Sequence, residues 1–80
     1  MKARVFVTPK RGVLDPAGKA VESSLHTLGF PEARDVRLGK YIELHLDGLA
    51  ADAARARVDE MCRKLLANGV IEDYRFEIDA

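Results

Sequence analysis

The chain passes from an expected strand to an expected helix through residues 8–20, Thr8-Pro9-Lys10-Arg11-Gly12-Val13-Leu14-Asp15-Pro16-Ala17-Gly18-Lys19-Ala20. Gly12 permits a backbone conformation that a Cβ atom would obstruct. Asp15 followed by Pro16 is typical of an N-cap with proline at the first helical position. The stretch therefore predicts an ordered loop and a helix that begins at Pro16.

Hydrophobic periodicity extends this prediction in both directions. Before the loop, Ala3, Val5 and Val7 alternate with polar residues, as in a strand with one buried face. After it, apolar residues recur at helical spacing and Gly29 is placed to end the helix. The predicted elements are a strand ending at Pro9, a helix over 16–28, a strand over 36–46, a helix over 51–66 and a strand over 74–78.

The middle strand admits two interpretations. Its apolar residues Val36, Leu38, Ile42, Leu44 and Leu46 share one parity, so a single long strand can run through Gly39 with a bend there. A glycine inside a strand also marks a bulge or the close approach of another backbone. Two short strands separated at Gly39 are therefore the alternative.

This order of elements predicts an α+β fold, a single domain over residues 1–80 in which both helices cover one face of the sheet as a two-layer sandwich. The other face is predicted to be polar with some aromatic residues, and it is either solvated or an assembly surface. Phe6, Tyr41, Glu43 and His45 are its candidate oligomer contacts. Its predicted residues are Arg4, Phe6, Arg37, Tyr41, Glu43, His45, Arg75 and Glu77.

Composition excludes several classes of protein. Thirteen basic and 13 acidic residues give a formal net charge of +0, so no cationic field is available to attract nucleic acid or anionic membranes. No segment approaches the ~20 apolar residues of a membrane span. Cys62 is the single cysteine, which rules out an intrachain disulfide and fits a reducing compartment. We expect a cytoplasmic protein.

Groups that could perform catalysis are sparse. Cys62 is predicted on the buried side of a helix, where a cysteine usually acts as a small hydrophobe. His26 and His45 lack the spacing of a metal site. We therefore expect no catalytic, cofactor-binding or metal-binding residues. Lys10 and Arg11, before a helix N-terminus, form the one anion-binding candidate, but Asp15 occupies the position that favours negative charge, so a structural turn is the preferred interpretation.

Several blocks of sequence resemble the PurS family, the small subunits of phosphoribosylformylglycinamidine synthase. They lie in the same order as in the family and span nearly the whole chain. The blocks are Thr8-Pro9-Lys10, Gly12-Val13-Leu14-Asp15-Pro16 with Gly18 and Ala20, Gly39-Lys40-Tyr41-Ile42-Glu43-Leu44, and Val70-Ile71-Glu72-Asp73-Tyr74.

The resemblance implies a role that the residues alone do not reveal. In the divided enzyme a glutaminase subunit releases ammonia, and a synthetase subunit, which binds ATP and Mg, uses it to make formylglycinamidine ribonucleotide. The small subunit is expected to join the two without catalysing the reaction and to support ammonia transfer. Independently of the resemblance, the small core of an 80-residue chain and the placement of Phe6 and Tyr41 outside it predict a homodimer or homotetramer. Lys10, Arg11, Gly12 and Asp15 are then candidate contacts with the larger subunits.

Two other classes of function remain as alternatives. A small ligand-sensing, ferredoxin-like regulatory module has the same arrangement of elements but needs a ligand pocket, for which the residue 10–15 loop is the only candidate. A nucleic-acid-binding sheet of the RRM kind would present aromatic residues on its open face. Glu43 and Glu77 on that face oppose a phosphate backbone.

Overall fold

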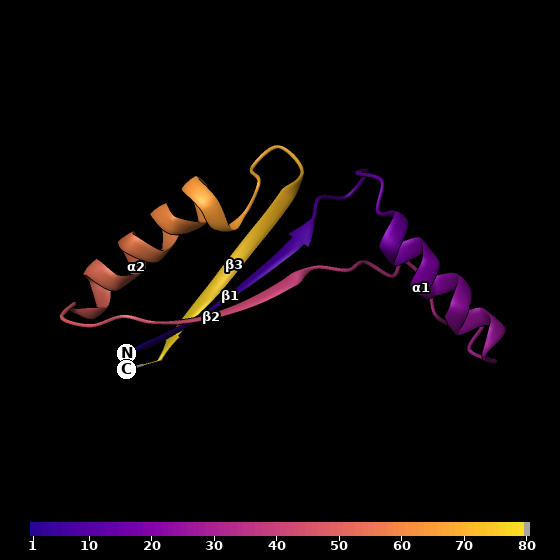
Figure 1. Ribbon diagram of the computed structural model, residues 1–80, viewed down its shortest axis with the longest axis horizontal. Coiled ribbons are helices and arrows are strands. Elements are labelled where there is room, and N and C mark those ends of the chain that lie inside the picture. The colour runs from indigo at the N-terminus through magenta and orange to yellow at the C-terminus, as the bar shows by residue number, and fades with distance from the viewer. Residues whose placement is uncertain (80) are drawn as a thin grey trace.

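The computed structural model of the chain describes residues 1–79 and confirms the α+β class and the predicted order of elements (Figure 1). None of the helices in these residues is long and apolar enough to cross a membrane. The elements are β1 (Lys2–Pro9), α1 (Pro16–Thr27), β2 (Lys40–His45), α2 (Ala51–Met61), the π-helical segment η1 (Cys62–Leu66) and β3 (Glu72–Asp79).

The three strands form one antiparallel sheet in the order β2-β1-β3. Val5, in the centre of β1, lies opposite Ile42 on one side and Phe76 on the other. Ala3, Val5 and Val7 are fully buried, whereas Arg4 and Phe6 between them are only half-buried. The alternation in the sequence thus identified the buried face of the central strand correctly.

The core lies between this face and α2. Ala54, Val58 and Cys62 of the second helix are completely buried against the sheet. The Tyr74 hydroxyl of β3 donates a hydrogen bond of 2.6 Å to Oδ1 of Asp59, which ties the helix to the edge strand. Asp59 also forms an ion pair with Arg63, at 2.9 Å.

The second helix does not keep α-helical geometry to residue 66 as predicted. At Cys62 it widens into η1, where the Ala67 amide donates to the Cys62 carbonyl five residues earlier, at 3.0 Å. The wider turn rotates the following side chains relative to the α-helical pattern. Leu65, which an unbroken α-helix with the same apolar spacing would turn toward the core, is consequently 82% exposed.

The predicted strand over 36–46 is shorter in the structure, because β2 begins at Lys40 and residues 36–39 form no separate strand. The backbone amides before β2 are engaged elsewhere: Leu38 donates to Oδ2 of Asp15 at 2.9 Å, and Val36 donates to Oε1 of Glu22 at 3.1 Å. Gly39 does lie where two backbones approach closely, since a Cβ atom there would overlap the Val7 carbonyl.

The placement of α1 contradicts the predicted two-layer sandwich. Among the described residues, α2 covers the sheet, whereas α1 extends beyond the end of the sheet at which β1 finishes (Figure 1). The molecule measures 49 × 25 × 14 Å, and its radius of gyration of 15.9 Å exceeds the ~12 Å of a compact 80-residue domain. No residue between 10 and 39 belongs to the core cluster of the described chain.

We call residues 10–39 the arm. Within it, the connector after α1 runs back along the polar side of the helix, held by the Glu22 bond to Val36 and by a 2.7 Å hydrogen bond between His26 Nε2 and the Ala33 carbonyl oxygen. A Cβ atom at Gly18 would lie 2.5 Å from the Val36 carbonyl oxygen, so the connector packs directly on the helix backbone. The arm is a small ordered unit of its own.

Candidate functional site

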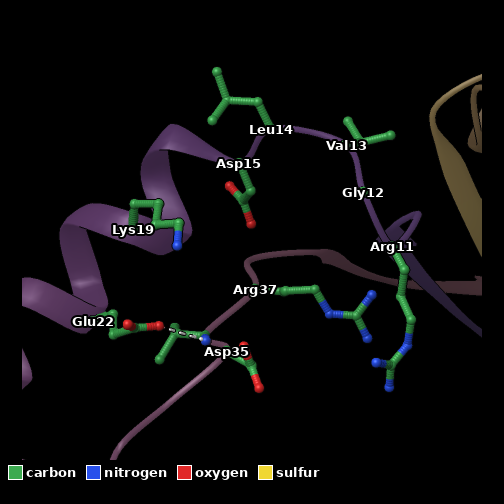
Figure 2. A pocket seen from close by; sticks show the side chains of 10 residues that line it. Arg11, Gly12, Val13, Leu14, Asp15, Lys19, Glu22, Asp35 and Arg37 are labelled. Carbon is green, nitrogen blue, oxygen red and sulfur yellow. Dashed lines mark hydrogen bonds between the residues drawn. The ribbon is translucent and has the colours of Figure 1, made fainter.

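The loop before α1 forms one wall of an open hollow of about 550 Å³, and the connector before β2 forms the other (Figure 2). Of the predicted loop contacts, Arg11, Gly12 and Asp15 line the hollow. Gly12 has a φ of 85°, in the left-handed region that favours glycine. The full lining is Arg11, Gly12, Val13, Leu14, Asp15, Lys19, Glu22, Asp35, Val36 and Arg37.

Asp15 joins the two walls. One carboxylate oxygen accepts from the Gly18 amide at 2.9 Å, which confirms the predicted N-cap, and the other accepts from the Leu38 amide at 2.9 Å. These two backbone hydrogen bonds, with a smaller contribution from the Arg37 charge, hold the pKa of the Asp15 carboxyl below its ordinary value. Asp15 is therefore a structural residue of the hollow.

Replacing Asp15 tests this role. We expect Asp15→Ala to lower the melting temperature by roughly 4–8 °C at neutral pH, since it removes the cap and the link to the connector. Because the folded-state pKa is lowered, the stabilisation is present above about pH 4 and is lost as the pH falls through the folded value. Thermal unfolding between pH 2 and 7 should show the difference from wild type shrinking in acid. An equal difference at every pH would contradict the charged cap, and Glu32→Ala is an exposed control.

Charges of both signs surround the hollow. Arg11, Lys19 and Arg37 contribute positive charge, and Asp15, Glu22 and Asp35 contribute negative charge. Arg37 was predicted on the open sheet face, but it precedes β2 and donates to the Pro9 carbonyl at 2.7 Å. The mixed charge favours a polar protein surface as the ligand of the hollow over a lone phosphate.

Lys10 differs from its neighbours, because its side chain turns to the sheet. Its Nζ lies 2.7 Å from Oδ1 of Asp73, next to the start of β3, and its amide donates to the Ile71 carbonyl at 2.8 Å. The structure thus places Arg11 in the hollow and Lys10 in a contact between the loop and β3.

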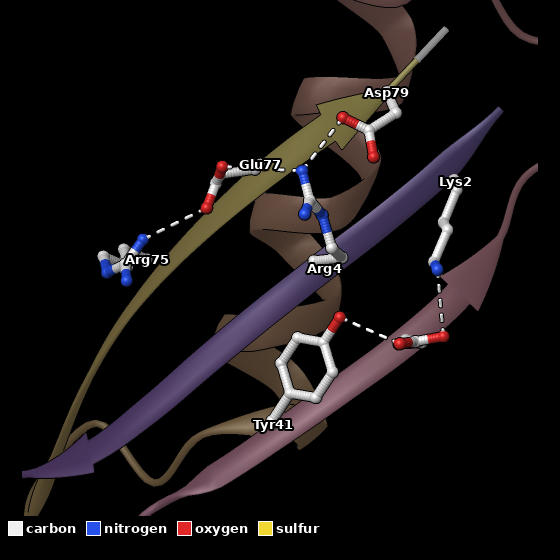
Figure 3. Close-up of polar contacts among 7 residues, drawn as sticks. Lys2, Arg4, Tyr41, Arg75, Glu77 and Asp79 are labelled. Carbon is white, nitrogen blue, oxygen red and sulfur yellow. Dashed lines mark hydrogen bonds and ion pairs between the residues drawn. The ribbon is translucent and has the colours of Figure 1, made fainter.

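The open face of the sheet carries a chain of ion pairs (Figure 3). Arg4, in the central strand, lies 3.0 Å from Asp79 and 3.6 Å from Glu77 on β3. Glu43 on β2 accepts a hydrogen bond from the Tyr41 hydroxyl at 2.9 Å and forms an ion pair with Lys2 at 3.1 Å. Both contacts lower the pKa of the Glu43 carboxyl, and the Tyr41 hydrogen bond has the larger effect. Much of the charge predicted for this face is therefore balanced across neighbouring strands.

Aromatic contacts occupy the end of the same face nearest the arm. The rings of Phe6 and Tyr41 lie 5.2 Å apart, and the Arg75 guanidinium sits 4.0 Å from the centre of the Phe6 ring. Tyr41 is 52% exposed. His45 lies opposite Lys2 at the other end of β2 and is exposed.

Cys62 has the environment of a structural cysteine. It is fully buried, and burial, followed by the nearby Asp59 charge, raises the pKa of its thiol. A raised pKa lowers the fraction of nucleophilic thiolate at neutral pH. Within residues 1–79, no cluster of three or more histidine, cysteine, aspartate or glutamate side chains is arranged to hold a metal ion.

Sequence reasoning missed an apolar groove of about 410 Å³ between β2 and the end of the second helix. The available signal was the spacing of Met61, Leu65 and Leu66, but the same spacing is equally typical of residues in the core of a regular helix. The groove is lined by Leu44, Arg57, Glu60, Met61, Lys64, Leu65 and Leu66.

Comparison with known proteins agrees with the resemblance inferred from the sequence. The chain matches the PurS family, described as phosphoribosylformylglycinamidine (FGAM) synthase, over residues 2–80. It is 50% identical to the phosphoribosylformylglycinamidine synthase subunit PurS of Bacillus subtilis over 78 residues, covering 98% of this chain and 92% of the relative. The corresponding subunit of Synechocystis is 52% identical, with 96% and 77% covered.

Solved structures give the same result. A B. subtilis PurS structure has a TM-score of 0.86 at 49% identity, covering 99% of this chain and 98% of that one. A chain in a structure of PurLQS from Thermotoga maritima has a TM-score of 0.86 at 30% identity, with 95% and 93% covered. The arm is included in these near-complete alignments. By sequence and by fold, this chain belongs to the PurS family, the small subunits of FGAM synthase in purine biosynthesis.

Proposed function

We propose that this chain joins a glutaminase subunit to an ATP-binding synthetase subunit and supports ammonia transfer between them. The reaction is the conversion of formylglycinamide ribonucleotide, with ATP and glutamine, to formylglycinamidine ribonucleotide. The observation that carries the proposal is the near-complete match to a chain of the T. maritima structure named PurLQS. ATP and Mg then belong to the synthetase subunit.

The engagement of its own polar groups supports a non-catalytic role for this chain. Asp15 is bound to two backbone amides, Glu43 to Tyr41 and Lys2, and Asp59 to Tyr74 and Arg63. The buried Cys62 thiol is a poor nucleophile, and a free buried cysteine also fits the proposed cytoplasmic location. These carboxylates stabilise the fold and do not converge on a common point where a substrate could react.

The arm supplies the proposed contact with the larger subunits. Arg11 and Gly12 line the hollow, and Lys10 lies beside them at the end of β1. The hollow is open, its charges are mixed in sign, and the adjacent Leu14 is 77% exposed. Exposed apolar side chains beside charges of both signs are typical of surfaces that bind another protein.

We also propose that the chain self-associates as a homodimer or homotetramer. Its elongated shape leaves the apolar residues of the arm outside the core. Small domains with so little buried surface commonly gain stability by oligomerisation. Phe6, Tyr41, Glu43 and His45 on the open sheet face remain one proposed contact surface for it.

Reconstitution of the enzyme tests the proposed role. The chain alone is expected to show no glutaminase, ATPase or amidotransferase activity. Added to purified glutaminase and synthetase subunits, it should restore glutamine-dependent formation of formylglycinamidine ribonucleotide, measured as product per minute. Ammonia in place of glutamine is the control, because the synthetase alone should accept it. Full glutamine-dependent activity without the chain would refute the proposal.

A further inference from the structure

We infer, on the basis of the function proposed above, that Arg11 and Arg37 together bind a carboxylate side chain of a larger subunit. The two arginines line the hollow between the loop before α1 and the connector before β2. The partner's acidic side chain is then held by guanidinium groups and not by the helix N-terminus, where Asp15 already accepts from the Gly18 amide.

The arm differs from the rest of the chain in how its positive charges are paired. Outside the arm, every lysine and arginine side chain except Arg55 forms an ion pair with a carboxylate of residues 1–79. Among the described residues of the arm, only Lys10 is paired, and its partner Asp73 belongs to β3. Positive charge without an ion-pair partner is therefore concentrated in the arm, at Arg11, Lys19, Arg34 and Arg37.

Two of these arginines converge. Figure 2 shows the Arg11 side chain coming from the loop and the Arg37 side chain from the connector, with both guanidinium groups in the same part of the hollow. A hydrogen bond agrees with this placement, because Nη1 of Arg37 donates at 2.7 Å to the carbonyl of Pro9, which lies close before Arg11 in the chain. Arginine stays protonated at physiological pH, so two full positive charges lie together here.

The acidic residues of the hollow do not neutralise this pair. Asp15 and Glu22 have carboxylate oxygens bound to backbone amides of the helix and the connector. The Arg37 charge lowers the pKa of Asp15 less than either of its backbone hydrogen bonds does. Asp35 lies apart from both guanidinium groups in Figure 2. Most N–H donors of the two arginines therefore have no acceptor among residues 1–79.

A carboxylate of another protein fits this arrangement better than a free phosphate. The planar fork of a guanidinium binds a carboxylate through two parallel hydrogen bonds. A phosphate group carries about −1.5 to −2 charge at neutral pH and would also meet Asp15, Glu22 and Asp35 in the same hollow. The half-buried Val13 and the exposed Leu14 add apolar surface beside the charges, which a protein segment can cover and a small anion cannot.

Binding measurements with single variants test the pair. Arg11→Gln and Arg37→Gln are each expected to raise the dissociation constant of this chain for the mixed glutaminase and synthetase subunits about tenfold or more, because each removes a charge-assisted contact with the carboxylate. Arg34→Gln is the matched control: Arg34 is an exposed arm arginine that lies outside the hollow. Its dissociation constant should stay within about twofold of wild type. Titration calorimetry measures the constants, and circular dichroism verifies that each variant is folded.

Zero-length cross-linking identifies the group that the arginines bind. Arg11→Lys keeps the positive charge and introduces a primary amine, which a carbodiimide couples to a carboxylate in direct contact. Digestion of the assembled complex followed by mass spectrometry should recover a peptide that joins position 11 to an aspartate or glutamate of a larger subunit. Arg34→Lys is the control for this step and should give no such peptide.

Weaker binding by both glutamine variants, together with a cross-link from position 11, supports the pair as a carboxylate site. A complex that forms as tightly with Arg11→Gln and Arg37→Gln as with Arg34→Gln overturns it and leaves the joining role intact. So does the absence of a subunit cross-link from position 11. Wild-type chain that binds neither larger subunit overturns the proposed function as well.

A titration with inorganic phosphate tests the small-anion alternative. The amide signals of Arg11, Gly12 and Arg37 in the ¹⁵N-labelled chain are expected to shift little below about 1 mM phosphate. Saturable shifts of these signals in that range, with no cross-link to a larger subunit, would assign the two arginines to a free anion and overturn the inference.

Discussion

Gly39→Ala is expected to lower the free energy of unfolding by about 2 kcal/mol or more. A Cβ atom at this position would overlap the Val7 carbonyl and press on the Thr8 backbone. Neither obstacle is a flexible side chain, so β1 and β2 must separate where Val7 pairs with Lys40. Urea denaturation followed by circular dichroism measures the change.

Gly69→Ala is the matched control, because no atom lies within 4 Å of a Cβ atom at Gly69. Its effect should stay within about 0.5 kcal/mol. If the two alanine variants were equally stable, the close approach of the two backbones at Gly39 would be wrong.

The double variant Lys10→Ala, Arg11→Ala is expected to reduce glutamine-dependent activity of the reconstituted enzyme about tenfold or more, while the chain itself remains folded. Truncation removes two charges and the Lys10 to Asp73 ion pair, and a surface pair contributes at most about 1 kcal/mol to stability. A tenfold loss corresponds to about 1.4 kcal/mol of binding energy, which fits the removal of charged contacts with the synthetase subunit.

Arg55→Ala, Arg63→Ala serves as the control for this variant. It also removes two exposed positive charges and one ion pair, that of Arg63 with Asp59, but from the second helix. Its activity should stay near wild type. Equal activity of both double variants would show that the loop is only a structural turn.

The features that the sequence predicted correctly depend on neighbouring residues. Asp15 caps α1 because amides of the first helical turn, such as that of Gly18, have no partner within the helix, and Pro16 fits the first turn. Gly12 adopts the positive φ that its place in the loop requires. The burial of Val5 and Val7 follows from alternation along one strand.

The features that could not be predicted from the sequence depend on where segments distant along the chain lie in the fold. The apolar stripe on α1 indicates that Val21 and Leu28 contact something, but periodicity does not say whether the partner is the sheet of the same chain. The parity of Val36 and Leu38 resembles a strand, yet their amides bond to Glu22 and Asp15 of the arm. The structure shows these competing hydrogen bonds, which no local pattern encodes.

Of the residues that line the hollow, those in the loop before α1 could be identified from the sequence, whereas those in the distant connector could not. Arg11, Gly12 and Asp15 are close together in the loop and line the hollow. Asp35 and Arg37 reach it from a connector some 20 residues later, because Asp15 binds that connector at Leu38. Lys10 lies outside the hollow because it pairs with Asp73, 63 residues away.

The central claim is that this chain joins the two larger subunits of the enzyme, and native mass spectrometry of the three purified subunits tests it most directly. The proposal predicts one species that contains this chain, the glutaminase and the synthetase, and it predicts that the glutaminase and the synthetase do not form a stable pair when this chain is omitted. A stable glutaminase–synthetase pair that forms without this chain and does not bind it when it is added would contradict the account.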